Sequence, residues 1–125
     1  MIIPCFNCEA TLEGTIRSIQ RERFDDIEII LVDDGSYDGS VTLFESVADA
    51  ARARVIRNVK NKGLAYTRAA GISAARGRYI QFVDADDELE NNILERAVRV
   101  IAKSQADLIM FNEEKRYLNK KYRVE

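Results

Sequence analysis

The sequence predicts an α/β protein with an open, mostly parallel sheet and helices on both of its faces. Apolar runs of strand length alternate with segments of helical periodicity along the 125 residues, in the order β-α-β-α-β-α-β-α-β. One run, Ile27–Val32, is almost continuously apolar, as expected for a strand that is buried on both faces. Polar clusters follow the strands, and open parallel sheets bind their ligands beyond the carboxyl ends of their strands. The sequence therefore predicts a ligand site at one edge of the sheet.

The first half of the chain contains two predicted strands, each followed by a helix. The sequence starts within the first strand, and the helix after it carries Leu12, Ile16 and Ile19 on one face. The second strand is the apolar run described above, and a second helical segment follows it. The elements expected in this half are Met1–Pro4, Glu9–Arg21, Ile27–Val32 and Val41–Ala51.

The second half is expected to contain three more strands with two helices between them. The first of these helices is rich in alanine, and Gly77 suits the position just past its C-terminus. The second helix carries Ile93 and Ile101 on its apolar face. The elements expected in this half are Arg54–Arg57, Leu64–Ala75, Tyr79–Val83, Asn92–Lys103 and Ala106–Phe111.

The composition favours one domain, residues 1–112, followed by a solvated charged tail, residues 113–125. The chain is 46% hydrophobic and 32% charged with a net charge of −2, so it can form a core but has no basic excess for binding nucleic acid. We expect no transmembrane segment and no secretory leader. These features and the two cysteines favour a reducing, cytoplasmic environment. The absence of histidine excludes a histidine general base.

An acidic cluster at the end of the fourth predicted strand is the first candidate site. Asp84 and Asp86 form a D-x-D, and Asp87 and Glu88 follow directly. Carboxylates at this spacing can bind Mg²⁺ or Mn²⁺, which would relieve their repulsion and bridge the phosphates of a nucleotide. Alternatively, Asp87 or Glu88 stabilises the N-terminus of the next helix. A haloacid-dehalogenase-type phosphatase is disfavoured, because its D-x-D should close the first strand.

A second acidic pair, Asp33 and Asp34, ends the second predicted strand in the stretch DDGSYDGS. Ser36, Asp38 or Ser40 could cap the following helix, but capping does not explain Asp33 and Asp34 together. The spacing also fits the calcium loop of an EF-hand. That motif needs a helix before the loop, whereas the preceding segment is strand-like.

Two further motifs follow predicted strands. Cys5 and Cys8 form a C-x-x-C between the first strand and helix, the position of a thioredoxin-type redox pair. Pro4 is the only proline, so no later proline can provide the cis turn of such folds, and we expect two semi-buried residues lining a loop. Lys62 and Arg68 lie at the start of the third helix, where they could bind an anion or a base, or simply be exposed.

Taken together, four stretches of the chain resemble glycosyltransferase family 2. They are IIPCFNCEATLEGTIRSI, DIEIILVDDGSYDGS, NKGLAYTRAAGISAARGRYIQFVDADD and ADLIMF, in the family's order and spacing. The resemblance implies the Rossmann-like GT-A fold and inverting transfer of a sugar from a UDP-linked or similar nucleotide-sugar donor. It also implies a Mn²⁺ or Mg²⁺ cofactor, an unknown saccharide or lipid-linked saccharide acceptor, polysaccharide biosynthesis, and a place at the cytoplasmic face of the membrane.

The resemblance also assigns roles to matching residues on the first two strands. Pro4, Phe6 and Asn7 would pass close to the nucleoside. Asp34 would accept a hydrogen bond from the base, and Asp33 would support the turn.

Four more residues receive roles in the second half of the chain. Lys62 and Arg68 match family positions near the base and the phosphates. Asp86 is expected to be the direct metal ligand. Asp84 is expected to contact the ribose and diphosphate, and it is the second candidate metal ligand.

The chain also departs from the family pattern. Cys5, Cys8 and Ala69 replace residue types that are more common in the family. The family's catalytic base and acceptor-binding segments lie well beyond the D-x-D, so the chain looks truncated at both ends.

No catalytic base is recognisable in this chain. Three carboxylates near its C-terminal end do not match the family motif: Asp107, Glu113 and Glu114. The alternative to an enzyme is therefore a non-catalytic module that holds a nucleotide-sugar. Association into a homo-oligomer is left open.

Overall fold

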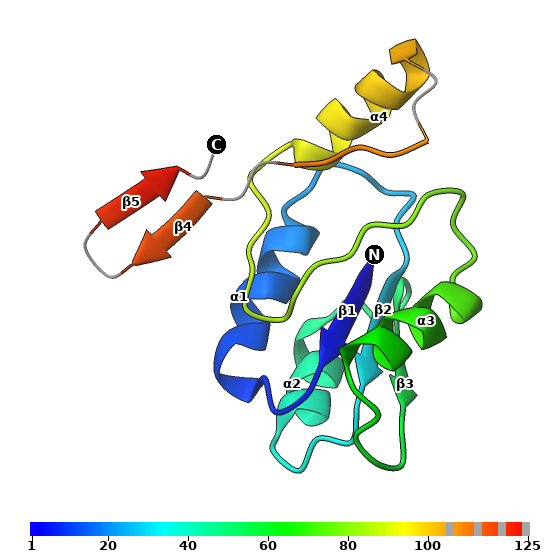
Figure 1. The fold of residues 1–125 in the computed structure, drawn as a ribbon, viewed down its shortest axis with the longest axis vertical. Coiled ribbons are helices and arrows are strands. Elements are labelled where there is room, and N and C mark those ends of the chain that lie inside the picture. Colours follow the sequence, from blue (N-terminus) through cyan, green and yellow to red (C-terminus); the bar gives the residue numbers. More distant parts are fainter. Residues whose placement is uncertain (105–106, 112–113, 118–119, 124–125) are drawn as a thin grey trace. The chain divides into compact units, whose positions relative to one another are not determined.

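The computed structural model describes residues 1–104, 107–111, 114–117 and 120–123. The chain divides into two compact units, Met1–Leu94 and Glu95–Glu125, which we describe separately. The first unit contains β1 (Ile2–Cys5), α1 (Glu9–Gln20), β2 (Ile29–Asp33), α2 (Ser40–Val47), β3 (Ala53–Arg57) and α3 (Leu64–Ala74) (Figure 1). The helix α4 (Ile93–Ser104) begins at the end of the first unit. The strands β4 (Glu114–Tyr117) and β5 (Lys120–Arg123) belong to the second unit.

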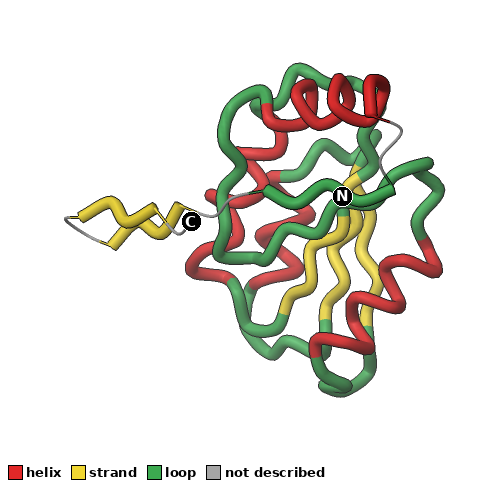
Figure 2. Tube along the Cα trace, turned by 45° about the horizontal axis from the view of Figure 1, so that its top comes forward, coloured by secondary structure: helices red, strands yellow, loops and turns green. Residues whose placement is uncertain are grey.

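The first unit is built on a parallel sheet in which β2 lies between β1 and β3. Ile2 pairs with Ile30 in one ladder, and Asp33 pairs with Arg57 in the other. Figure 2 shows the three strands running side by side with helices around them. The predicted α/β class and the parallel direction of the sheet are confirmed.

Helices cover both faces of this sheet, because both faces are apolar. On one face, Leu12 and Ile16 of α1 and Phe44 of α2 are buried against Ile3 and Leu31. On the other face, α3 packs against a second cluster composed of Ile2, Ile30 and Val32, with Ala70 partly buried beside it. Figure 1 shows α1 and α2 on one side of the strands and α3 on the other. The carboxyl ends of the strands remain available for a site.

The fourth and fifth strands were predicted incorrectly. Tyr79–Val83 forms only one parallel bridge, between Phe82 and Ile2, flanked by backbone hydrogen bonds of Ile2 to Gln81 and of Val83 to Ile2. Within the described residues, this segment pairs on one side alone. Residues 107–111 form no strand either, and Ala106 lies outside the described residues. An apolar run becomes a strand only if a neighbouring strand takes up its backbone hydrogen bonds.

The charged segment after residue 112 contains strands that the sequence analysis did not predict. β4 and β5 pair in antiparallel fashion, with Glu114 opposite Arg123. An antiparallel pair close in sequence can satisfy its backbone groups locally. Glu113 lies outside the described residues. Within the part of the chain that the structure describes, no helix combines the length and apolarity needed to cross a bilayer.

Candidate functional site

A cavity of about 250 Å³ lies at the carboxyl ends of β1 and β2. Three of the predicted site residues, Pro4, Phe6 and Asp34, line it. The other residues of its wall are Cys5, Asn61, Gly63, Leu64 and Thr67. The cavity is therefore bounded by the loop after β1, the end of β2 and the first turns of α3, as expected for a ligand site of an open parallel sheet.

The loop after β1 is tied to the loop after β2. Asn7 adopts a left-handed backbone conformation with φ of 51°, and its N–H donates to Ser36 Oγ at 2.9 Å. The Asn7 side-chain oxygen accepts a hydrogen bond from the Tyr37 N–H at 3.0 Å. The Phe6 ring is 46% exposed and meets the Tyr37 ring edge-to-face, with 6.0 Å between centroids. This geometry presents an aromatic surface at the rim of the cavity.

Asp33 contributes hydrogen bonds to the turn after β2. Its carboxylate is buried and accepts a hydrogen bond from the Ser36 N–H at 3.0 Å. Its backbone oxygen accepts the Asn58 N–H at 2.8 Å. Asp33 thus holds the loops that follow β2 and β3, and it does not line the cavity.

Asp34 fastens the loop that precedes α3. Its carboxylate accepts hydrogen bonds from Asn58 Nδ2 at 2.8 Å, from the Lys62 N–H at 2.9 Å and from the Gly63 N–H at 2.8 Å. Burial by itself would raise the pKa of Asp34. The hydrogen bonds from Asn58 and from the two loop N–H groups outweigh burial, so the pKa of Asp34 lies below its ordinary value. Asp34 is therefore an anion whose oxygens are already engaged by the protein.

The two basic residues predicted for this site are held by different partners. Lys62 Nζ donates to the Tyr66 hydroxyl at 2.9 Å and lies 4.2 Å from the centre of its ring. Arg68 Nη2 donates to Asp84 Oδ1 at 2.8 Å, and its guanidinium lies over the Phe82 ring. Arg68 Nε is buried and has no hydrogen-bond partner among the described residues.

The D-x-D segment lies at the same edge of the sheet as Asp34. The Ala85 carbonyl accepts a hydrogen bond from Thr11 Oγ1, in the first turn of α1, at 2.8 Å. The Asp34 N–H donates to the Cys5 carbonyl, in the strand immediately before α1, at 2.8 Å. Both acidic segments therefore flank the β1–α1 connection.

Arginines relieve part of the charge repulsion that suggested a metal. Arg68 pairs with Asp84, and Arg21 pairs with Glu88 at 3.4 Å. Asp86 is exposed and forms no hydrogen bond or ion pair with the residues that the structure describes. Across the same residues, no group of three or more candidate ligand side chains converges.

Sequence reasoning did not assign several residues of the cavity region to the site. Asn61, Leu64 and Thr67 line the cavity, and Asn58 orients the carboxylate of Asp34. Asn58 directly follows β3, so its place at the carboxyl end of a strand was a usable signal. Leu64 and Thr67 carried no such signal, because their contribution depends on how α3 packs against the sheet.

The prediction for the C-x-x-C was wrong in one respect. Cys5 and Cys8 do line a loop, but they are joined by a disulfide, with 6.0 Å between their Cα atoms. Spacing alone could not establish this bond, because the same two positions also suit separate thiols.

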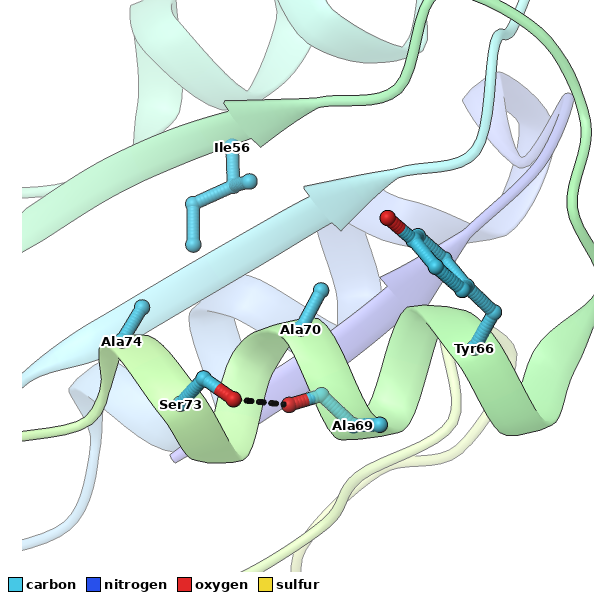
Figure 3. Close-up of a pocket in the computed structure, with 6 residues that line it drawn as sticks. All are labelled: Ile56, Tyr66, Ala69, Ala70, Ser73 and Ala74. Atoms are coloured by element: carbon cyan, nitrogen blue, oxygen red, sulfur yellow. Dashed lines mark hydrogen bonds between the residues drawn. The ribbon is translucent and has the colours of Figure 1, made fainter.

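A second hollow, of about 460 Å³, lies over α3 and β3 and has a different character. Figure 3 shows its six lining residues, Ile56, Tyr66, Ala69, Ala70, Ser73 and Ala74. The Ser73 hydroxyl is bonded to the Ala69 carbonyl of its own helix at 3.0 Å. This wall comes from β3 and α3 alone, whereas the cavity beside Asp34 lies at the carboxyl ends of β1 and β2, so the cavity beside Asp34 is the better candidate site.

Comparison with solved structures defines the class of protein. The N-terminal part of Staphylococcus aureus TarS, solved in complex with UDP-GlcNAc, superposes with a TM-score of 0.81 at 26% identity. The match covers 85% of this chain and 31% of the solved TarS chain, residues 1–349. A mannosyltransferase from Pyrobaculum calidifontis, solved with GDP-Man and Mn²⁺, shares the fold with a TM-score of 0.73 at 20% identity, over 82% of this chain and 32% of the mannosyltransferase. The fold is that of the GT-A glycosyltransferases.

The sequence then identifies the family. Residues 1–123 match the family described as Glycosyl transferase family 2, and the chain belongs to it. The uncharacterized glycosyltransferase EpsJ of Bacillus subtilis is 42% identical over 87% of this chain and 32% of EpsJ. The cholesterol galactosyltransferase of Borreliella burgdorferi is 41% identical over 76% of this chain and 26% of that protein. The chain thus spans about a third of the length of these relatives or less.

Proposed function

We propose that this chain is the donor-binding part of a glycosyltransferase that takes its sugar from a uridine diphosphate sugar. The observation that carries the proposal is the cavity at the carboxyl ends of β1 and β2, with Phe6 at its rim and Asp34 in its wall. TarS, whose fold is similar, was solved with UDP-GlcNAc. The Escherichia coli relative WfaP, 37% identical over 70% of this chain and 34% of WfaP, has UDP-Glc in its name.

The residues around the cavity suit the parts of such a donor. The exposed Phe6 ring offers a flat surface for the base. Asp34 is an anionic acceptor for a base N–H, although that hydrogen bond must share or replace one that Asn58 or the Lys62–Gly63 loop already donates. Arg68, held at Asp84, supplies positive charge for the diphosphate. Lys62 is exposed next to Tyr66 and can turn toward the donor.

Asp86 is suited to bind a divalent cation together with oxygen atoms of the donor. Mg²⁺ is usually held by one or two carboxylates together with phosphate oxygens, and Asp86 is an exposed carboxylate with no described partner. Asp84 is the second candidate ligand and would have to loosen its pair with Arg68. When bound, Mn²⁺ or Mg²⁺ would stabilise the charge that develops on the leaving diphosphate. We further propose that transfer inverts the anomeric centre, with a saccharide or lipid-linked saccharide as acceptor.

A second candidate function is a module that binds the donor without turnover. The chain covers about a third or less of the length of its relatives, and this favours binding without turnover for the isolated chain. Asp107 is exposed in the second unit, and no described contact assigns it to the proton transfer that an acceptor hydroxyl requires.

The proposal is tested by calorimetric titration of the chain with UDP and with GDP, in Mn²⁺ and in EDTA. UDP should bind more tightly than GDP, and EDTA should weaken UDP binding. Phe6→Ala should weaken UDP binding severalfold through loss of stacking. The matched control is Ile72→Ala, an exposed apolar residue on α3 that does not line the cavity. Absence of UDP binding by the folded chain would refute the proposal.

A further inference from the structure

The Cys5–Cys8 disulfide closes the loop that forms one wall of the cavity. Cys5 is the last residue of β1, and Cys8 directly precedes α1. The bond therefore spans Phe6 and Asn7, and these cysteines are the only two in the chain. Because the bonded loop is so short, the disulfide restricts the backbone at both residues.

Both restricted residues take part in the geometry of the cavity. Phe6 lines it, and Asn7 holds a left-handed backbone conformation that residues other than glycine rarely adopt. Asn7 is also the residue that bonds the loop after β2, through Ser36 and Tyr37. Breaking or forming the Cys5–Cys8 bond would therefore change the position of the Phe6 ring and the hydrogen bonds that join the two loops.

The two sulfurs differ in accessibility. Cys5 is 3% exposed and lies 3.9 Å from the Ser36 hydroxyl, whereas Cys8 is half-buried. Thiol–disulfide exchange needs an attacking thiolate to reach one sulfur of the bond. The outer sulfur, that of Cys8, is the one to be attacked, and the sulfur of Cys5 is then the leaving group beside Ser36.

We propose that Cys5 and Cys8 are a reversible thiol–disulfide modification site that tunes the donor cavity. In oxidation, the Cys8 thiolate attacks a glutathione-type disulfide and expels one small thiol. The Cys5 thiolate then attacks the mixed disulfide at Cys8 and expels the second. Two protein thiols and one small disulfide thus become one protein disulfide and two small thiols. The oxidised chain holds Phe6 and Asn7 in place and binds the donor more tightly than the reduced chain.

The effect on donor affinity rests on the proposed function, so the test has two independent readouts. The full chain is equilibrated in glutathione buffers from fully reduced to fully oxidised, and its free thiols are counted by alkylation and mass spectrometry. Backbone amide NMR signals of Phe6, Asn7, Ser36 and Tyr37 are recorded across the series. UDP affinity is then measured for the two end states. We expect a reversible transition, shifted amide signals, and UDP affinity about fivefold higher in the oxidised chain, because immobilising the loop beforehand lowers the cost of binding.

Two variants serve as controls. Cys8→Ser removes the more exposed partner, and Cys5→Ser removes the buried one in case the first variant affects folding. In Cys8→Ser, UDP affinity and the four amide signals should not respond to the glutathione ratio. In Cys5→Ser, Cys8 can form only a mixed disulfide with glutathione, which mass spectrometry detects, and the rise in UDP affinity on oxidation should be absent.

The outcomes separate the two proposals. Failure of the chain to form the disulfide, or amide signals that stay unchanged on oxidation, overturns the modification site whether or not UDP binds. Equal UDP affinities of the oxidised and reduced chains would contradict the proposal that the disulfide tunes the donor cavity. Amide signals that shift reversibly in a chain that binds no UDP in either state support the modification site and refute the proposed function.

Discussion

Asp34 and Asp38 lie close together in the sequence, but their carboxylates hold different parts of the chain. Asp34 accepts hydrogen bonds from the loop that begins α3. Asp38 accepts the N–H groups of Ser40 and Glu9, at the starts of α2 and α1. The sequence predicted a helix cap or turn for Asp38, and the family resemblance implied a hydrogen bond from Asp34 to the base. The contacts separate them, since Asp34 lines the cavity and Asp38 does not.

This difference predicts the outcome of two alanine substitutions. Asp34→Ala should weaken UDP binding more than Asp38→Ala, because a lost hydrogen bond to a charged group costs about 1.5–3 kcal/mol. Asp38→Ala should mainly lower the free energy of unfolding, by about 1 kcal/mol, as the loss of a helix cap does. Calorimetry and urea denaturation of both variants would test this, and equal UDP affinities would contradict the assignment of Asp34.

The lowered pKa of Asp34 predicts how stability depends on pH. A carboxyl group whose pKa is lower in the folded state stabilises the fold at pH values above its unfolded pKa. That contribution is lost as the pH falls through the folded pKa, below the ordinary value of 3.8. Wild type should therefore lose more stability between pH 6 and pH 3 than Asp34→Asn, as measured by urea denaturation. Parallel losses in the two proteins would show that Asp34 is not the group responsible.

Asp86 predicts the response to metal. Asp86→Asn should abolish the tightening of UDP binding by Mn²⁺, because the amide keeps the shape of the side chain but loses its charge. Asp87→Asn is the matched control and should have a smaller effect, because we expect the Asp87 carboxylate to face the following helix. Titrations with Mn²⁺ and with EDTA give the comparison. Metal-dependent binding that survives in Asp86→Asn would mean that this carboxylate is not the ligand.

At the scale of elements, local pattern predicted the helices better than the strands. The helix expected at Glu9–Arg21 is observed at Glu9–Gln20, because its apolar spacing, Leu12, Ile16 and Ile19, specifies the buried face directly. The strand expected at Tyr79–Val83 shrinks to one bridge. A strand depends on partners distant in sequence, and no local pattern contains that information.

The packing of α3 against the sheet predicts a sensitive glycine. A Cβ atom at Gly71 would lie 2.5 Å from Ile2 Cγ2 and 3.2 Å from Val32 Cγ2. Gly71→Ala should lower the free energy of unfolding, because overpacking typically costs about 1–3 kcal/mol and outweighs a helix-propensity gain of about 1 kcal/mol. Ser73→Ala, at an exposed position of the same helix, is the control. A higher denaturation midpoint for Gly71→Ala would show that the contact relaxes at little cost.

At the scale of the whole molecule, the donor residues and the rest of a transferase separate along the chain. All proposed donor residues lie between Pro4 and Asp86, within the first unit. This arrangement was predictable from the order of the motifs. The acceptor side was not, because the chain covers about a third of its relatives and no residue matches the family's base.

This separation predicts binding without turnover. The intact chain should bind UDP with help from Mn²⁺, but release little or no UDP from UDP-sugars in the presence of saccharide acceptors. Both measurements should be made on one preparation, so that binding confirms that the protein is folded. Efficient transfer would show that a base lies within these 125 residues after all.

The parallel order of the first unit also has an electrostatic consequence. Because α1, α2 and α3 each follow a strand of the same sheet, all three begin at the same edge of that sheet. Each helix N-terminus carries roughly half a positive charge from its aligned peptide dipoles. The positive ends of the three helix dipoles therefore lie at the edge of the sheet where the carboxylates gather. A chain of net charge −2 can thus attract a diphosphate without a cluster of lysines and arginines.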